Sequence, residues 1–135
     1  MPTLFDYNAT VVTPITDGVS IAVPQTPVRA DIASVIVNVP NVVPRFVEIR
    51  ATVGVRADAG FGQYLYRVLR GGTEIYYSLV GIEFGAETFN LDTLLVIDGN
   101  SPPGPQVYTL SIEKFTAGLT ATVVGPIEIS ASSFG

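Results

Sequence analysis

The chain has 135 residues, of which 47% are hydrophobic and only 14% are charged, and its formal net charge is −5. Seven basic residues, with one lysine among them, are scattered between twelve acidic ones, so no basic cluster is available to bind a nucleic acid or an anionic membrane surface. Cysteine and histidine are absent, which excludes disulfides, thiolate metal sites and any mechanism that relies on an imidazole base.

Residues 1–27 form the first predicted element, an extended N-terminal arm. The arm is rich in valine, threonine, isoleucine and aromatic residues, yet four prolines interrupt it, which is unlike a central strand. An extended apolar segment of this kind gains most by adding itself to a sheet edge, either its own or a neighbour's. The residues that we expect to form a subunit interface through this arm are Phe5, Tyr7, Val11, Val12 and Ile15.

Residues 28–135 are expected to form one domain built of strands. Apolar residues alternate with polar ones, and turn signals recur about every ten residues, which is typical of a β-sandwich or barrel. No segment has a sustained helical period. The pattern therefore predicts an all-β, jelly-roll-like antiparallel sandwich of about eight strands with an extended N-terminal arm. The clearest predicted strands span residues 28–39, 46–56, 63–70, 73–80, 87–97, 107–114 and 121–130.

Two of these strands have a well-specified local geometry. In residues 46–56 the apolar side chains occupy alternate positions and charged or polar ones the positions between, so a slip of one residue would bury charge. Residues 63–70 and 73–80 are separated by Gly71-Gly72, which predicts a two-residue hairpin with a type I′ turn. Asp98 to Pro105 is expected to form a long loop.

Few residues are candidates for catalysis. Lys114 is expected at a strand end, where a solvated lysine or salt bridge is the commoner role. Two pairs of acids, Glu83 with Glu87 and Asp92 with Asp98, would have to meet in a cleft to act together. Since tryptophan is absent, the aromatic platforms usual in carbohydrate-active sandwiches are weakly represented. We expect no enzymatic activity.

Calcium is the next candidate ligand, because the sequence offers oxygen ligands for it. Asp92, Asp98 and Asn100 carry suitable side chains, but the spacing differs from that of a calcium loop. An Asx-type turn with Gly99 at positive φ explains the Asp98-Gly99-Asn100 segment better. No cofactor is expected.

Four segments resemble parts of small jelly-roll domains from bacterial spore surfaces. These are Val47-Glu-Ile-Arg-Ala-Thr-Val-Gly-Val55, Val68-Leu-Arg-Gly-Gly-Thr-Glu-Ile75, Val107-Tyr-Thr-Leu-Ser-Ile112 and Val123-Val-Gly-Pro-Ile-Glu-Ile129. The chain is similar in pattern to endospore appendage fibre subunits and to the C-terminal domains of collagen-like exosporium proteins. The resemblance implies a jelly roll related in shape to tumour-necrosis-factor-like trimers and, for appendage subunits, an N-terminal connector that docks into the next subunit. This chain has no collagen-like repeat and no cysteine for cross-linking, so its contacts would be non-covalent.

These observations lead to one predicted function and two alternatives. We expect a self-assembling structural protein of a spore-surface fibre, which polymerises by docking its arm onto a neighbouring copy and which a spore-surface anchoring protein holds in place. The first alternative is a trimeric binding head, related in shape to tumour necrosis factor or C1q, for carbohydrate or a surface receptor; the second is a phage or virion decoration protein. No signal peptide is visible, so we expect synthesis in the cytosol and function at the cell or spore surface. No apolar run approaches the ~18 residues of a membrane span, so membrane insertion is not expected.

Overall fold

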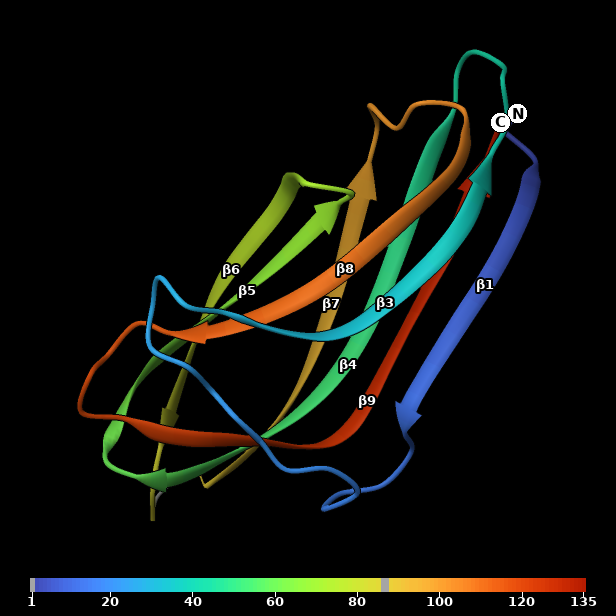
Figure 1. The fold of residues 1–135 in the computed structure, drawn as a ribbon. Coiled ribbons are helices and arrows are strands. Elements are labelled where there is room, and N and C mark those ends of the chain that lie inside the picture. The colour runs from blue at the N-terminus through green and yellow to red at the C-terminus, as the bar shows by residue number, and fades with distance from the viewer. Residues whose placement is uncertain (1, 86–87) are drawn as a thin grey trace.

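The computed structural model describes residues 2–85 and 88–135. Within these residues there are strands, turns and loops but no helix, and therefore no helix that could cross a membrane. The nine strands, labelled in Figure 1 where there is room, are β1 (Leu4–Thr13), β2 (Ile21–Ala22), β3 (Ala30–Val39), β4 (Phe46–Ala59), β5 (Phe61–Arg70), β6 (Thr73–Glu83), β7 (Phe89–Asp98), β8 (Gly104–Lys114) and β9 (Thr120–Phe134).

The strands form two antiparallel sheets that pack as a sandwich (Figure 1). One sheet has the order β1-β9-β4-β7, with the short β2 also paired to β9, and the other has the order β3-β8-β5-β6. The pairing is nested along the chain: β1 pairs with β9, β3 with β8, β4 with β7 and β5 with β6. This nesting is that of a hairpin rolled up on itself, so the fold is a jelly roll, as predicted.

The core lies between the sheets and follows the predicted alternation. Val47, Ile49 and Val53 on β4 are buried, and the charged residues between them point away from the core. The second sheet contributes three fully buried tyrosines to the core: Tyr64 and Tyr66 on β5, and Tyr108 on β8. The alternation expected for residues 46–56 is therefore confirmed.

The β5–β6 hairpin has the predicted two-residue loop, with Arg70 opposite Thr73. Gly71 has a φ of 59°, but Gly72 is not among the residues with positive φ. A type I′ turn needs positive φ at both positions, whereas a type II′ turn needs it only at the first. The turn type predicted from the sequence is thus wrong, and the observed geometry fits type II′.

The predicted arm supplies β1, which is one of the eight long strands of the roll. It pairs along its length with β9 of its own chain, from Leu4 opposite Phe134 to Thr13 opposite Ile127. Residues 14–29 then cross to the second sheet and include the short β2. A strand that pairs within its own chain can also be exchanged between copies. The division into an arm, residues 1–27, and a domain, residues 28–135, therefore stays a prediction.

Candidate interaction surface

The β1 strand is held in the sandwich almost without burying apolar side chains. The hydrophobic core contains no residue of β1, and Thr13 is the one buried residue of the strand. The side chains of the predicted interface are instead exposed, from 42% for Val12 to 61% for Ile15. The structure places four members of this predicted set on β1 and Ile15 just after it, all of them exposed: Phe5, Tyr7, Val11, Val12 and Ile15.

Main-chain pairing and polar side chains hold β1 in place. On one side it pairs with β9, and beyond the strand the amide of Thr3 donates a 2.9 Å hydrogen bond to the carbonyl of Gly135. Toward the second sheet, Oδ2 of Asp6 accepts a 2.8 Å hydrogen bond from the backbone amide of Asn38. Nδ2 of Asn8 donates a 3.0 Å hydrogen bond to the carbonyl of Ile36. These bonds fix the position of β1 but exclude little apolar surface from water.

The outer face of the first sheet is polar in its centre and apolar along its two borders. One row of paired residues crosses all four strands of this sheet. It consists of Ala9 on β1, Ser130 on β9, Arg50 on β4 and Leu95 on β7. The central strands also present other polar side chains here, whereas both border strands present large apolar ones. On β7 these are Phe89, Leu91, Leu95 and Ile97, each at least 56% exposed.

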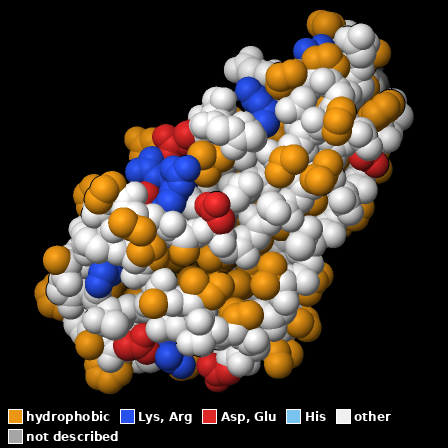
Figure 2. Space-filling model, viewed as in Figure 1, with side chains coloured by type: hydrophobic (Ala, Val, Ile, Leu, Met, Phe, Trp, Pro, Cys, Tyr) orange, Lys and Arg blue, Asp and Glu red, His pale blue; other side chains and the backbone are white. Residues whose placement is uncertain are grey.

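Exposed apolar side chains are not confined to that face. In Figure 2, hydrophobic groups are spread over the visible surface and charged groups are few. Tyr77 and Leu79 on β6 are also exposed, and Phe61 and Phe84 lie open near strand ends. Where such side chains lie next to one another, as along β1 and along β7, they are candidates for contact with another surface.

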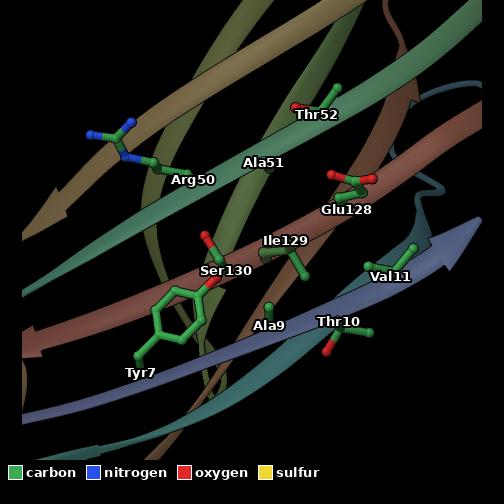
Figure 3. Close-up of a pocket in the computed structure, with 10 residues that line it drawn as sticks. All are labelled: Tyr7, Ala9, Thr10, Val11, Arg50, Ala51, Thr52, Glu128, Ile129 and Ser130. Carbon is green, nitrogen blue, oxygen red and sulfur yellow. The ribbon is translucent and has the colours of Figure 1, made fainter. Parts of the chain in front are cut away.

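A shallow hollow lies on the outer face where β1, β9 and β4 run side by side (Figure 3). Its volume is about 280 Å³, and it is lined by side chains of mixed polarity. Tyr7 contributes an aromatic ring, and Arg50 and Glu128 contribute opposite charges from neighbouring strands. Arg50 forms a 2.6 Å ion pair with Glu48, and an ion pair near the surface of this kind contributes little to stability.

Two polar clusters join the sheets at opposite ends of β7. At one end the hydroxyls of Tyr64 and Tyr66 donate hydrogen bonds of 2.5 and 2.7 Å to Oδ2 of Asp92. Nδ2 of Asn90 donates a 3.1 Å hydrogen bond to the hydroxyl of Tyr64. Burial is the main reason why the pKa values of both tyrosines lie above the ordinary value, and the neighbouring carboxylate raises them further. Both tyrosines therefore remain neutral donors.

The second cluster is built around Asp98, which is buried. Its Oδ2 accepts from Nη1 of Arg70 at 2.5 Å and from the hydroxyl of Tyr108 at 2.8 Å. Burial, together with the hydrogen bond to Asp98, raises the pKa of Tyr108, although a bond with Ser101 lowers it. In both clusters groups of the fold itself donate to the aspartate, so each cluster has a structural role.

The residues considered for catalysis or calcium do not converge on a site. Lys114 lies at the end of β8, and its Nζ donates a 2.7 Å hydrogen bond to the carbonyl of Leu119. Asp92 and Asp98 belong to the separate clusters described above, and within residues 2–85 and 88–135 no group of three metal-ligating side chains occurs. The amide of Asn100 donates to Oδ1 of Asp98, as in the predicted Asx turn, but Gly99 is not at positive φ, which corrects that detail. Glu87 lies outside the described residues.

Sequence reasoning missed the apolar border on β7 and the hollow beside β1. A signal for the first was present, because β7 is apolar on both faces near Leu94 and Leu95, which is typical of a strand covered on both sides. The hollow left no such signal. Arg50 and Glu128 are 78 positions apart along the chain, and only the pairing of β4 with β9 brings them together.

No protein-family model matches the chain, and no curated protein matches it in sequence. Among solved structures, the infectious bursal disease virus VP2 subviral particle aligns over 98% of this chain and 40% of its own, with 14% identity and a TM-score of 0.49. Dimeric latent PorU from Porphyromonas gingivalis aligns over 98% of this chain and 13% of its own, with 11% identity and a TM-score of 0.47. TmCBM61, solved in complex with β-1,4-galactotriose, aligns over 91% of this chain and 86% of its own, with 14% identity and a TM-score of 0.42. At these identities and TM-scores, the likeness says nothing of what this chain binds or builds.

Proposed function

We propose that this protein is a self-assembling structural subunit that polymerises non-covalently by docking β1 onto a neighbouring copy. One observation carries the proposal: β1 is bound by main-chain pairing and polar contacts, while its large apolar side chains remain exposed. The resemblance to spore-surface jelly rolls gives the setting, a fibre on the spore or cell surface attached through an anchoring protein. The role is structural and includes no catalytic step.

The energetics favour docking of this strand. Burying one large apolar side chain contributes about 1.5–3 kcal/mol, and β1 with the following turn offers several. Main-chain hydrogen bonds at a sheet edge add about 0.5–1.5 kcal/mol each. Association costs of roughly 4–15 kcal/mol can therefore be exceeded by a contact that involves most of this segment. A heterologous contact that does not close on itself extends into a fibre.

The proposal is tested by comparing the full-length protein with a variant that lacks residues 1–12. Thr13 is retained because it is buried. We expect fibres in negative-stain electron micrographs of the full-length protein and only discrete particles of the variant. The strand content of the variant in circular dichroism should fall only by the contribution of β1. A matched variant keeps the strand length but replaces Phe5, Tyr7, Val11, Val12 and Ile15 with serine, and it should also fail to polymerise. Discrete particles from the full-length protein at high concentration would contradict the proposal.

A second candidate, the binding head, is favoured by the hollow between β1, β9 and β4. An aromatic ring beside an arginine and a carboxylate can stack on a sugar and hydrogen-bond to its hydroxyls. This function predicts glycan binding by a protein that forms only closed oligomers, and loss of that binding in Tyr7→Ala and Arg50→Ala. Fibres without glycan binding would exclude it in favour of the first candidate.

A further inference from the structure

The outer edge of β7 is a free sheet edge. The strand pairs with β4 over ten residue positions, and among the described residues no strand pairs with its other side. Its ten residues extend from Phe89 to Asp98 without a bulge in that pairing. A long regular edge of this kind leaves a row of main-chain donors and acceptors open to another strand.

The usual protections against strand addition are missing from β7. Its sequence contains no proline, lysine or arginine, and its exposed side chains are mostly large and apolar. Charged side chains that point inward can also protect an edge, and β7 has Asp92 and Asp98. However, tyrosine hydroxyls and Arg70 already donate to these carboxylates within the chain, so a new neighbouring strand leaves neither carboxylate without a hydrogen-bond partner.

The β1 strand is the opposite border of the same sheet. Among the described residues no strand pairs with its outer side, although the side chains of Asp6 and Asn8 bond to the backbone of β3. The direction of β1 suits β7. Neighbours in this sheet are all antiparallel, so β1 and β4 run one way and β9 and β7 the other. A second copy placed beside β7 in the same orientation would therefore present its β1 antiparallel to β7. The apolar side chains of the two borders would then meet on one face, while the polar centre of the sheet stays in water.

We infer that the β7 edge of one copy is the docking site for the β1 strand of the next, with β1 still paired to its own β9. The first sheets of successive copies then form one continuous antiparallel sheet. The contact is head-to-tail, since it joins two different edges, and this geometry suits an open fibre. The inference rests on the proposed function and specifies where the arm docks.

Engineered disulfides test this contact directly, because the native chain has no cysteine. Thr93→Cys on β7 is combined in turn with Tyr7→Cys, Ala9→Cys or Val11→Cys on β1. Within one chain β9 and β4 separate these positions by about 14 Å, three strand spacings, which is beyond the reach of a disulfide. Every disulfide formed under a mild copper oxidant must therefore join two copies. We expect a ladder of covalent oligomers on non-reducing gels for at least one of the three pairs, and none for the single variants.

A control pair distinguishes edge addition from exchange of β1. Ala9 lies opposite Ser130 in the β1–β9 register. The double variant Ala9→Cys with Ser130→Cys should give an internal disulfide and monomers on the gel if β1 stays on its own chain. A ladder from this pair, with none from the β1–β7 pairs, would overturn the inference in favour of exchanged strands and would leave the proposed function standing. Fibres without any ladder would overturn it too, and an absence of fibres would refute the proposed function itself.

A charge substitution supplies a second measurement without cysteines. Leu95→Lys places a lysine on the β7 edge strand, and Val43→Lys makes the same change at a position 88% exposed in a loop. We expect Leu95→Lys to lower the pelleted fibre fraction about tenfold and Val43→Lys to leave it within about twofold. Equal effects of the two variants would contradict a docking site on β7.

Discussion

The hydroxyl of Tyr66 on β5 donates a 2.7 Å hydrogen bond to Oδ2 of Asp92 on β7 and so joins the inner faces of the two sheets. Tyr64 donates to the same oxygen. On this side of the sandwich the edge strands β6 and β7 touch only slightly, and Asn90 adds a bond to the carbonyl of Gly81 on β6. The cluster thus fixes the position of the edge that we propose as the docking site.

We predict that the two tyrosine hydroxyls stabilise the fold cooperatively. Tyr64→Phe and Tyr66→Phe should each lower the free energy of unfolding by about 1–2 kcal/mol, because each removes one donor to a carboxylate. The double variant should lose more than the sum, since Asp92 then keeps no tyrosine partner between the sheets. Urea denaturation measures these values, and Tyr77→Phe, at an exposed position, is the control. Strict additivity would argue against a shared acceptor.

The buried carboxylate of Glu113 should make the fold sensitive to acid. Burial raises its pKa, but hydrogen bonds from Thr26 and Arg67 outweigh this, so the pKa lies below its ordinary value of 4.5. A lowered pKa in the folded state contributes stability that is present above pH 4.5 and lost as the pH falls through the folded value. Glu113→Gln should therefore be less stable at neutral pH by about 1–3 kcal/mol and lose less stability on acidification.

Thermal unfolding at pH 7 and pH 3 checks this prediction. Glu128→Gln, on the exposed outer face, is the matched control and should behave as the native protein does. If Glu113→Gln loses as much stability in acid as the native chain, the acid sensitivity has another source.

Gly125 is expected to be intolerant of a side chain. Its φ is +93°, and an added Cβ would lie 2.6 Å from Cγ2 of Thr13 and 2.7 Å from the carbonyl oxygen of Ile15. Gly125→Ala should therefore cost at least about 2 kcal/mol of stability, through backbone strain and steric overlap. Gly72→Ala, where no atom lies within 4 Å, should cost less than about 1 kcal/mol in the same denaturant experiment. A small effect at Gly125 would show that the segment after β1 is not held against β9.

Assembly and stability should respond differently to changes on β1. Phe5→Ser combined with Tyr7→Ser should reduce fibre formation strongly, because it removes two exposed apolar side chains of the proposed contact. The unfolding free energy should change by less than about 0.5 kcal/mol, since neither side chain is in the core. Light scattering measures assembly, and Val28→Ser is the control at an exposed valine outside β1. A large loss of stability would indicate a role inside the fold instead.

Much of the fold was predictable because strand periodicity is a local property of the sequence. The alternation in β4 correctly predicts Val47, Ile49 and Val53 as core residues, and the hairpin glycines correctly predict the β5–β6 loop. The candidate surface was only half predictable. The exposed apolar residues of β1 were expected to form an interface, but the hollow depends on pairings between distant strands that no local pattern encodes.

By itself, the sequence determined that this chain is a β-sandwich, because apolar residues at every second position can be buried only on one face of a sheet. It also determined that residues 1–27 are extended and apolar. Only the tertiary structure decided that β1 is the first of the nested strands and pairs with the last, which makes β1 and β7 the two border strands of one sheet. The reason is physical: hydrogen bonding between strands is alike in every pairing, so partners are chosen by the packing of the whole chain.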